Sequence, residues 1–246
     1  MNIEIVGNRA AVDEPGTLAR GIIGHLEQVD DISTDPLVNP DLIVFCRRVD
    51  DGLGDVITRC NDPENPIPLL FLPSKIGPPT IEGEQHFPLI QARNVNLSVV
   101  QYMLDVVDAG TSDYYGCDMG ITEHHQWRKK DLSGTALWII DEVTGSVASG
   151  SIRDVRDLEE TKRAFPEHLG VQALGPDDFY AIHQTEFIDP VSRQVLKPVD
   201  DIVVIGHDGY GAGVEAVARA VATKQEYFTP GNHDIVQMMR DEVIAA

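Results

Sequence analysis

Short apolar runs alternate with polar segments rich in glycine and proline over the first part of the chain. Runs of this kind, bounded by turn residues, are typical of strands that a parallel sheet buries on both faces. Leucine and isoleucine at helical spacing predict a helix between the first two runs. The expected strands are 3–6, 42–46, 67–72 and 87–92, and the expected helices are 17–29 and 51–60. This part therefore predicts a short, mostly parallel sheet with helices packed on it.

Beyond residue 94, segments with helical spacing alternate with strand-like runs. The expected strands are 115–121, 180–187 and 202–205, and the expected helices are 99–107, 135–143, 155–165, 214–223 and 232–244. We therefore predict an α/β fold with a truncated Rossmann-like N-terminal part, 1–93, and a C-terminal α+β open-sheet domain, 94–224. The segment 225–246 is expected to return to the first part as a helix.

The loop after the first expected strand stands where a dinucleotide-binding fingerprint would stand. Gly7 is followed by Asn-Arg-Ala-Ala-Val rather than by Gly-x-x-Gly, and Gly16 offers only a late substitute on a longer loop. A strand–helix unit of roughly 30 residues is missing before Asp41, or is reduced to 32–38. Without those backbone N–H groups the pyrophosphate loses an anchor, so we expect weak or altered dinucleotide binding.

The stretch from Gly120 to Ala136, which we call the central motif, concentrates the candidate chemistry, and we expect it at an edge of the open sheet of the C-terminal domain. His124 and His125 precede three consecutive cations at 128–130, and Ser-Gly-Thr follows at 133–135. Ser133 or Thr135 is a suitable N-cap for the next helix. A helix N-terminus attracts anions, and neighbouring cations add charge-assisted hydrogen bonds. The stretch therefore predicts a carboxylate or phosphate site beside an imidazole that titrates near neutral pH.

At these residues the sequence resembles the dihydrodipicolinate reductases, whose signature reads Glu-x-His-His-x-x-Lys-x-Asp-x-Pro-Ser-Gly-Thr-Ala. The two histidines and Ser133 to Ala136 match this signature without a gap. Four positions depart from it: Thr122 replaces Glu, Arg128 replaces Lys, Lys130 replaces Asp and Leu132 replaces Pro. The resemblance keeps its register over about 94–224, whereas over 1–93 it extends only to the order of the strands. The chain therefore looks like a divergent member of the family whose N-terminal, dinucleotide-binding half has lost most of the family's cofactor-binding residues.

The resemblance implies a reductase of a small cyclic imine or unsaturated carboxylic acid that uses NADPH or NADH. It implies a catalytic set of His124, Arg128 and Lys129, with His124 as the proton donor. It implies a substrate-binding set of His125, Ser133, Gly134 and Thr135, which would hold a carboxylate. The cofactor-binding candidates are Gly7, Gly16 and Asn96, the last in an Asn-Leu-Ser segment similar to the family's hinge. The family's pairing of C-terminal sheets implies a homotetramer.

Two other classes of function remain open, because the cofactor residues are eroded while the substrate residues are kept. One is a non-redox cyclase, lyase or isomerase on the same scaffold, which would work without a cofactor. The other is a non-catalytic homologue that serves in binding or assembly.

Charge and composition exclude several partners. A formal net charge of −21 argues against binding to nucleic-acid backbones and to anionic membrane surfaces. We see neither a signal peptide nor a membrane-length apolar run, and the three cysteines lack metal-binding spacing, so a cytoplasmic protein is expected.

No metal site is expected from the sequence. Gly-Asn-His-Asp at 231–234 matches a metallophosphoesterase signature but lacks its companion motifs. His124 and His125 are adjacent, so their side chains should point to opposite faces where the expected strand 115–121 continues through them.

Overall fold

The computed structural model describes residues 2–7, 18–27, 31–46, 52–72, 79–92, 94–129 and 131–245. The chain divides into two compact units. Unit 1 comprises Met1–Val100 and His207–Ala246, and unit 2 comprises Gln101–Gly206. Gly16 and the loop that carries it lie outside the described residues, as does Lys130.

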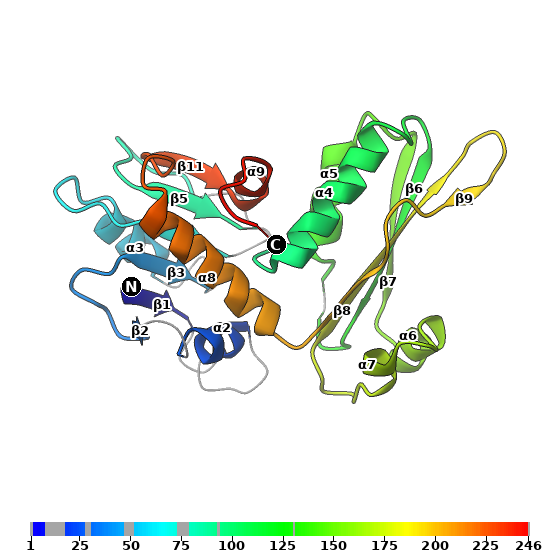
Figure 1. Cartoon of the computed structure of the whole chain (residues 1–246), viewed down its shortest axis with the longest axis horizontal. Coiled ribbons are helices and arrows are strands. Elements are labelled where there is room, and N and C mark those ends of the chain that lie inside the picture. Colours follow the sequence, from blue (N-terminus) through cyan, green and yellow to red (C-terminus); the bar gives the residue numbers. More distant parts are fainter. Residues whose placement is uncertain are drawn as a thin grey trace. The chain divides into compact units, whose positions relative to one another are not determined.

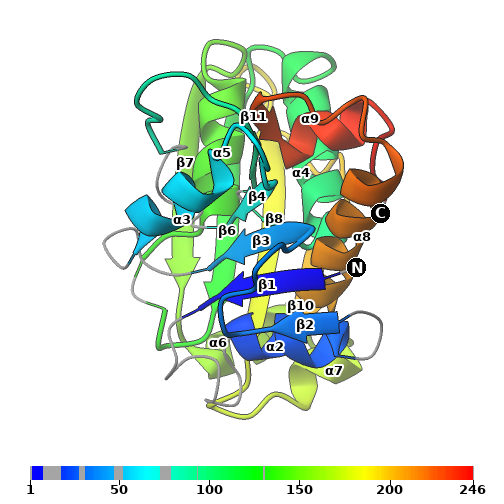
Figure 2. The ribbon, with the colours of Figure 1, turned by 90° about the vertical axis from the view of Figure 1, so that its left-hand side faces the viewer.

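Unit 1 is built on a six-stranded sheet in the order β11-β5-β4-β3-β1-β2, and every neighbouring pair is parallel. Figure 2 shows this order from β11 near the top to β2 below. The strands are β1 (Asn2–Val6), β2 (Asp31–Ser33), β3 (Leu42–Phe45), β4 (Leu69–Phe71), β5 (Pro88–Gln91) and β11 (Gly231–Asp234). The two central strands β3 and β4 are buried along their whole length, as their continuous apolar runs predict. The Rossmann-like part of the predicted fold class is confirmed.

The helices of unit 1 are α2 (Leu18–Leu26), α3 (Leu53–Cys60), the beginning of α4 (Leu97–Thr111), α8 (Asp208–Thr223) and α9 (Ile235–Arg240). α8 packs against α2 (Figure 1). His25 on α2 lies 2.8 Å from Glu215 on α8, measured from Nε2 to Oε2. The segment 208–223 therefore belongs to unit 1, and the boundary of the second unit lies at Gly206 rather than at the expected residue 224.

The segment after α8 also differs from the expected helix 232–244. Residues Gly231–Asp234 form β11, which pairs with β5, and the helix α9 follows it. Asp234 caps this helix, because its Oδ1 accepts a hydrogen bond of 2.7 Å from the N–H of Val236. The polar strand Gly-Asn-His-Asp carries no apolar pattern, so only its pairing with β5 identifies it.

Unit 2 contains a mixed sheet in the order β10-β8-β6-β7, with β9 beside β8. The strands are β6 (Asp118–His125), β7 (Ser149–Val155), β8 (Tyr180–Ile188), β9 (Val195–Leu196) and β10 (Ile202–Ile205). β6, which carries the two histidines, is parallel to β7 and antiparallel to β8. β6 therefore lies inside the sheet. We had expected it at the edge of the sheet. The polar, largely exposed sequence of β7 gave no strand signal.

Helices cover both faces of this second sheet to different extents (Figure 1). α4 and α5 (Gly134–Val143) pack on one face, where the hydroxyl of Tyr102 lies 2.7 Å from Oγ1 of Thr185 on β8. α6 (Leu158–Ala164) lies on the other face, and α7 (Leu169–Gln172) follows it. Unit 2 is thus an α+β domain, as predicted.

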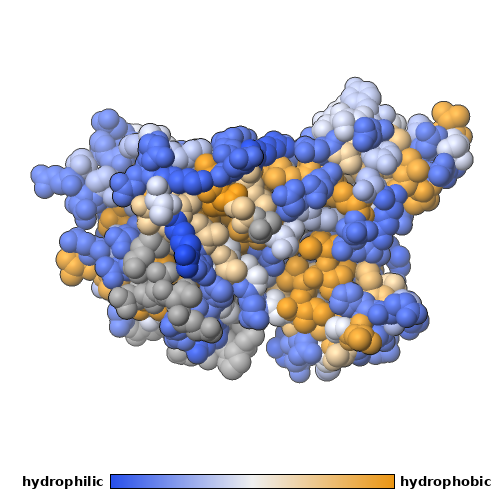
Figure 3. Space-filling view, in the orientation of Figure 1, coloured by the Kyte–Doolittle hydropathy of each residue, from blue (hydrophilic) through white to orange (hydrophobic). Residues whose placement is uncertain are grey.

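On the face drawn in Figure 3, hydrophilic residues alternate with apolar patches. One patch lies at the hairpin of β9, where the exposed fractions of Val191 and Val195 are 90% and 54%. None of the helices within the described residues combines the length and the hydropathy that a membrane span needs.

Candidate functional site

The pleat of β6 separates the residues of the central motif. Glu123 and His125 lie on the face that α4 and α5 cover, and His124 lies on the opposite face. On the neighbouring strand, His183 is paired with Glu123 and lies on the same face. The strand register, rather than the adjacency of the two histidines, therefore decides which side chains meet.

A buried polar cluster forms on the helix-covered face, and we call it the Glu–His cluster. It consists of Glu123, His125 and His183 together with Ser133 at the start of α5. All four residues are at most 4% exposed. The cluster thus places one carboxylate, two imidazoles and one hydroxyl in the interior of unit 2.

The hydroxyl of Ser133 contacts both Glu123 and His183 of this cluster. This hydroxyl caps α5 by accepting a hydrogen bond from the N–H of Ala136 at 3.0 Å, which confirms the expected N-cap. The same hydroxyl donates to Oε2 of Glu123 at 2.6 Å and lies 3.0 Å from Nε2 of His183. A hydroxyl has one proton, so Nε2 of His183 must be the donor in the second contact. Nδ1 of His183 then carries a lone pair, which has no hydrogen-bond partner among the described residues.

Glu123 brings a negative charge to the start of α5. Its carboxylate accepts hydrogen bonds from the backbone N–H of Ser133 at 3.0 and 3.2 Å. Arg156 lies 3.6 Å from Oε1 of Glu123. Glu123 occupies a position that the reductase signature leaves open. The chain therefore supplies its own carboxylate near the helix start where we had expected a substrate carboxylate.

Burial and neighbouring cations keep the two imidazoles of the cluster neutral. Burial, followed by the charge of Lys129, lowers the pKa of His125. Burial lowers the pKa of His183 to about 3. Nζ of the half-buried Lys129 lies 3.2 Å from Nε2 of His125. An ammonium can only donate, so this nitrogen of His125 is the acceptor.

His124 lies in a different environment on the other face of the sheet. Its Nδ1 is 3.1 Å from Oγ1 of Thr161, and its Nε2 is 3.2 Å from Oε1 of Gln184. The ring meets Phe165 edge-on, with 5.3 Å between the centroids. Burial is the main cause of its lowered pKa. Both ring nitrogens of the expected proton donor are thus engaged by protein side chains.

Arg128, the other predicted catalytic cation, contacts neither the Glu–His cluster nor His124 in the contacts described for it. Arg128 forms an ion pair of 2.6 Å with Asp177, in which the side chains are 59% and 69% exposed, and its guanidinium lies 5.3 Å from the ring centroid of Trp127. Gly134 and Thr135 are buried in the first turn of α5. The structure thus brings His125, Lys129 and Ser133 together, whereas it sets His124 and Arg128 apart from them.

In unit 1, Gly7 follows the end of β1. The chain passes from β1 to β2 on one side and then to β3 on the other, so the strand order reverses at β1. Open α/β sheets bind ligands outside the carboxyl ends of the strands at such a switch point.

Asn96, the other described cofactor candidate, has a structural role. Its Oδ1 accepts a hydrogen bond of 3.2 Å from the N–H of Ser98 at the start of α4. It also packs closely on Gly209, where an added Cβ would lie 2.4 Å from Nδ2 of Asn96.

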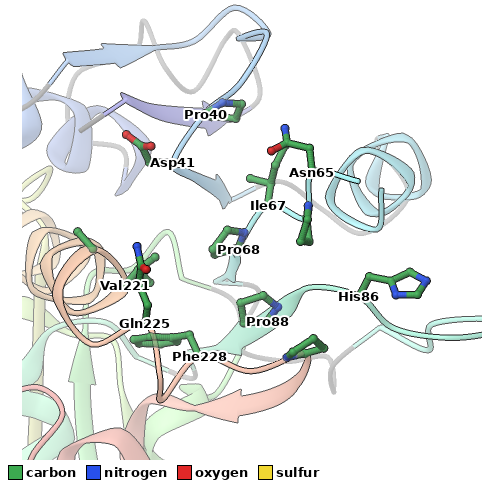
Figure 4. A pocket seen from close by; sticks show the side chains of 13 residues that line it. Pro40, Asp41, Asn65, Ile67, Pro68, His86, Pro88, Val221, Gln225 and Phe228 are labelled. Atoms are coloured by element: carbon green, nitrogen blue, oxygen red, sulfur yellow. The ribbon is translucent and has the colours of Figure 1, made fainter. Parts of the chain in front are cut away.

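A hollow of about 640 Å³ lies at the amino ends of the strands of the same sheet, opposite their carboxyl ends (Figure 4). Its lining includes Asp41, Pro68 and Pro88, which stand at the amino ends of β3, β4 and β5, together with His86 and Phe228. Dinucleotides bind at carboxyl ends in folds of this type. This hollow is therefore not where we expect a nicotinamide cofactor.

Sequence reasoning missed Glu123 and His183. His183 lies within the expected strand 180–187, whereas Glu123 lies just beyond the expected strand 115–121. Their meeting depends on the register between β6 and β8, which no local pattern contains.

Comparison with known proteins adds a distant likeness. No protein-family model and no curated protein matches the chain. Among solved structures, the chain is similar to a crystal structure of a mutant meso-dapdh of Clostridium tetani E88 with DAP. The TM-score is 0.42, the sequence identity is 8%, and the match covers 98% of this chain and 95% of that chain. A likeness at this level carries no inference about function.

Proposed function

We propose that the chain is a reductase that uses NADPH or NADH to reduce a small cyclic imine or unsaturated carboxylic acid. The switch point of unit 1 is the observation that carries the proposal, because β1 has β2 on one side and β3 on the other and Gly7 follows it. The carboxyl ends of β1 and β3 are where such a sheet binds a dinucleotide.

Unit 2 would supply the groups that act on the substrate. We propose Lys129, in place of Arg128, as the cation that binds the substrate carboxylate, since Lys129 contacts the Glu–His cluster while Arg128 is paired with Asp177. We keep His124 as the proposed general acid, and because it lies on the opposite face of β6 from the Glu–His cluster, the substrate would have to extend past the end of β6 to meet both His124 and Lys129. For this role its imidazole must exchange Thr161 or Gln184 for substrate, and catalytic hydrogen bonds often form only in the complex.

One observation favours a second candidate, a non-redox cyclase, lyase or isomerase that works without a cofactor. The sequence after β1 lacks the Gly-x-x-Gly turn, so the pyrophosphate would have fewer backbone donors. In this case the acid–base groups of unit 2 would act alone.

Cofactor titration followed by turnover assays tests these alternatives. NADPH and NADH are titrated against the purified protein by calorimetry and fluorescence, and we expect saturable binding that is weaker than the low micromolar range. A panel of cyclic imino acids and unsaturated carboxylic acids is then assayed with and without the better cofactor. Turnover only with cofactor supports the reductase, and cofactor-independent turnover supports the second candidate. Absence of cofactor binding at millimolar concentration would overturn the reductase proposal.

A further inference from the structure

The Glu–His cluster has the donor set of a metal site. We propose that Glu123, His125 and His183 bind a divalent transition-metal ion, with Zn²⁺ as the best-suited ion. One ligand atom from each residue lies within 4.8 Å of the other two. Two imidazoles and one carboxylate form a common three-residue zinc site that leaves a fourth position open. This inference rests on the geometry of the cluster, and it shares Lys129 with the reductase proposal.

The distances require only a modest closure around an ion. Oε2 of Glu123 lies 3.8 Å from Nε2 of His183. Bonds of about 2.0–2.2 Å in a tetrahedral site put ligand atoms about 3.3 Å apart. Because the widest separation is at most 4.8 Å, the ligand atoms need to approach one another by about 1.5 Å or less. Side-chain rotations within the cluster can supply a movement of this size.

The surroundings of the ligands resemble the outer contacts of metal sites. Metals bind an imidazole nitrogen that carries no proton, and Nε2 of His125 is such a nitrogen, because it accepts the hydrogen bond of Lys129. The carboxylate of Glu123 is oriented by the N–H and hydroxyl of Ser133, as outer partners orient metal ligands. Nε2 of His183 faces Glu123, and an ion bound there would replace its hydrogen bond to Ser133. Nδ1 of His183, which has no partner among the described residues, can take over the ring proton, so the imidazole stays neutral when Nε2 becomes a ligand.

Lys129 stands in competition with the ion. Its ammonium, 3.2 Å from Nε2 of His125, repels a divalent cation and engages one candidate donor atom. Lys129 is half-buried on the loop between β6 and α5, so its long side chain can turn away toward solvent. Metal binding should therefore displace the ammonium, and removal of this charge should strengthen binding.

The same residues do not form a nucleophilic triad. In a triad the acid orients the imidazole and the imidazole contacts the hydroxyl. Here Glu123 accepts the proton of the Ser133 hydroxyl, while Nδ1 of His183 has no partner within the described residues. Ser133 is also only 4% exposed, which withholds its hydroxyl from a substrate. A metal site accounts for the arrangement better than covalent catalysis.

Metal titration of the full chain tests the proposal. Chelator-treated protein is titrated with Zn²⁺ at pH 7 by calorimetry and by competition with a chromophoric chelator. We expect one ion per chain for the wild type. H183Q and E123Q should weaken binding by about a hundredfold or more, and K129M should strengthen it by about tenfold, from the loss of a buried repulsion. H124Q is the matched control on the opposite face of β6 and should bind like the wild type.

Two results would overturn the proposal. One is the absence of saturable Zn²⁺ binding in both the wild type and K129M. The other is unchanged stoichiometry and affinity in H183Q, which would assign the ion to surface carboxylates. If H183Q fails to fold, as judged by its near-ultraviolet circular dichroism, the comparison of K129M with the wild type still decides, because equal affinities would place the ion away from Lys129.

Discussion

Ser133 joins the start of α5 to two strands through its backbone N–H and its hydroxyl. Ser133→Ala removes the N-cap and leaves Glu123 and His183 with one buried partner fewer. We expect the free energy of unfolding to fall by about 1–3 kcal/mol. Urea unfolding followed by circular dichroism measures it. Ser149→Ala, which removes an exposed hydroxyl that donates to Asp118, should change stability by less than about 0.5 kcal/mol. Equal losses in the two variants would show that the Ser133 hydroxyl has no special role.

His124 carries the proposed general-acid role. Its replacement by alanine should lower kcat by about 10²–10⁴, the usual contribution of a general acid, and leave KM nearly unchanged. The measurement is steady-state kinetics with the substrate found in the panel. Thr161→Val, which removes the Nδ1 partner of His124 and keeps the ring, should have a smaller effect on kcat than His124→Ala. Full activity of His124→Ala would remove His124 from the mechanism.

His207 predicts a dependence of stability on pH. Burial lowers its pKa below the ordinary value of 6.5. The unfolded chain therefore takes up a proton at a higher pH than the folded chain, and the stability contributed by the neutral ring is lost as the pH falls below 6.5. The slope for one histidine is at most about 1.4 kcal/mol per pH unit. Urea unfolding at pH 7 and pH 5 should show a smaller loss for His207→Gln than for the wild type, whereas parallel profiles would contradict this assignment.

Local sequence chemistry predicted several residue environments and missed others. The Ser-Gly-Thr segment predicted a cap at Ser133 or Thr135, and the structure has it at Ser133. Strand alternation predicted that His124 and His125 point apart, as they do. The partners of these residues were not predictable in the same way. Glu123 meets His183 because two distant strands pair in one register, and Arg128 turns to Asp177 on a remote loop. Such contacts depend on tertiary packing.

At the level of helices, Gly213 allows α8 to pack closely against the backbone at Val95. A Cβ added at this position would lie 1.6 Å from the carbonyl oxygen of Val95, which is backbone and cannot move aside easily. Gly213→Ala should therefore destabilise unit 1 by about 2 kcal/mol or more, through overpacking. Thermal and urea unfolding measure the change.

Gly24 on α2 provides the matched control. Nothing lies within 4 Å of a Cβ added there, so Gly24→Ala should be neutral or stabilise by up to about 1 kcal/mol through helix propensity. A destabilisation of the same size in both variants would show that the close approach at Gly213 is not the cause.

Apolar periodicity located the elements that bury a face and failed for those that do not. β3, β4 and β10 were expected at nearly their observed positions, since each is a run of apolar residues. β7 and β11 are polar and are strands only because a neighbour supplies their hydrogen bonds. This explains why the central motif was expected at an edge of the sheet, since the strand outside it was not recognised.

For the whole molecule we predict a homotetramer formed through the sheets of unit 2. One face of that sheet is covered by α4 and α5, while the other face, which α6 covers only in part, leaves Ser151, Arg153 and Glu186 exposed. Open sheet faces and edges are commonly covered by a second copy. Light scattering should give a mass near four times 27.0 kDa. Ser151→Arg on the open face should lower this mass, and Ser112→Arg at the exposed end of α4 should not. A mass of one chain for the wild type would rule the tetramer out.

The pairing of β11 with β5 has a consequence for the chain during its synthesis. β5 is complete when Gln91 leaves the ribosome, but its partner follows only after the whole of unit 2 has been made. At 5–20 residues per second, the intervening stretch of about 140 residues takes roughly 7–28 s. Throughout this interval β5 is an apolar edge strand, and the backbone groups on its outer side have no partner. Such an edge can pair with other nascent chains. Slow translation of unit 2 should therefore increase aggregation, and a chaperone that shields strand edges should act mainly in this window.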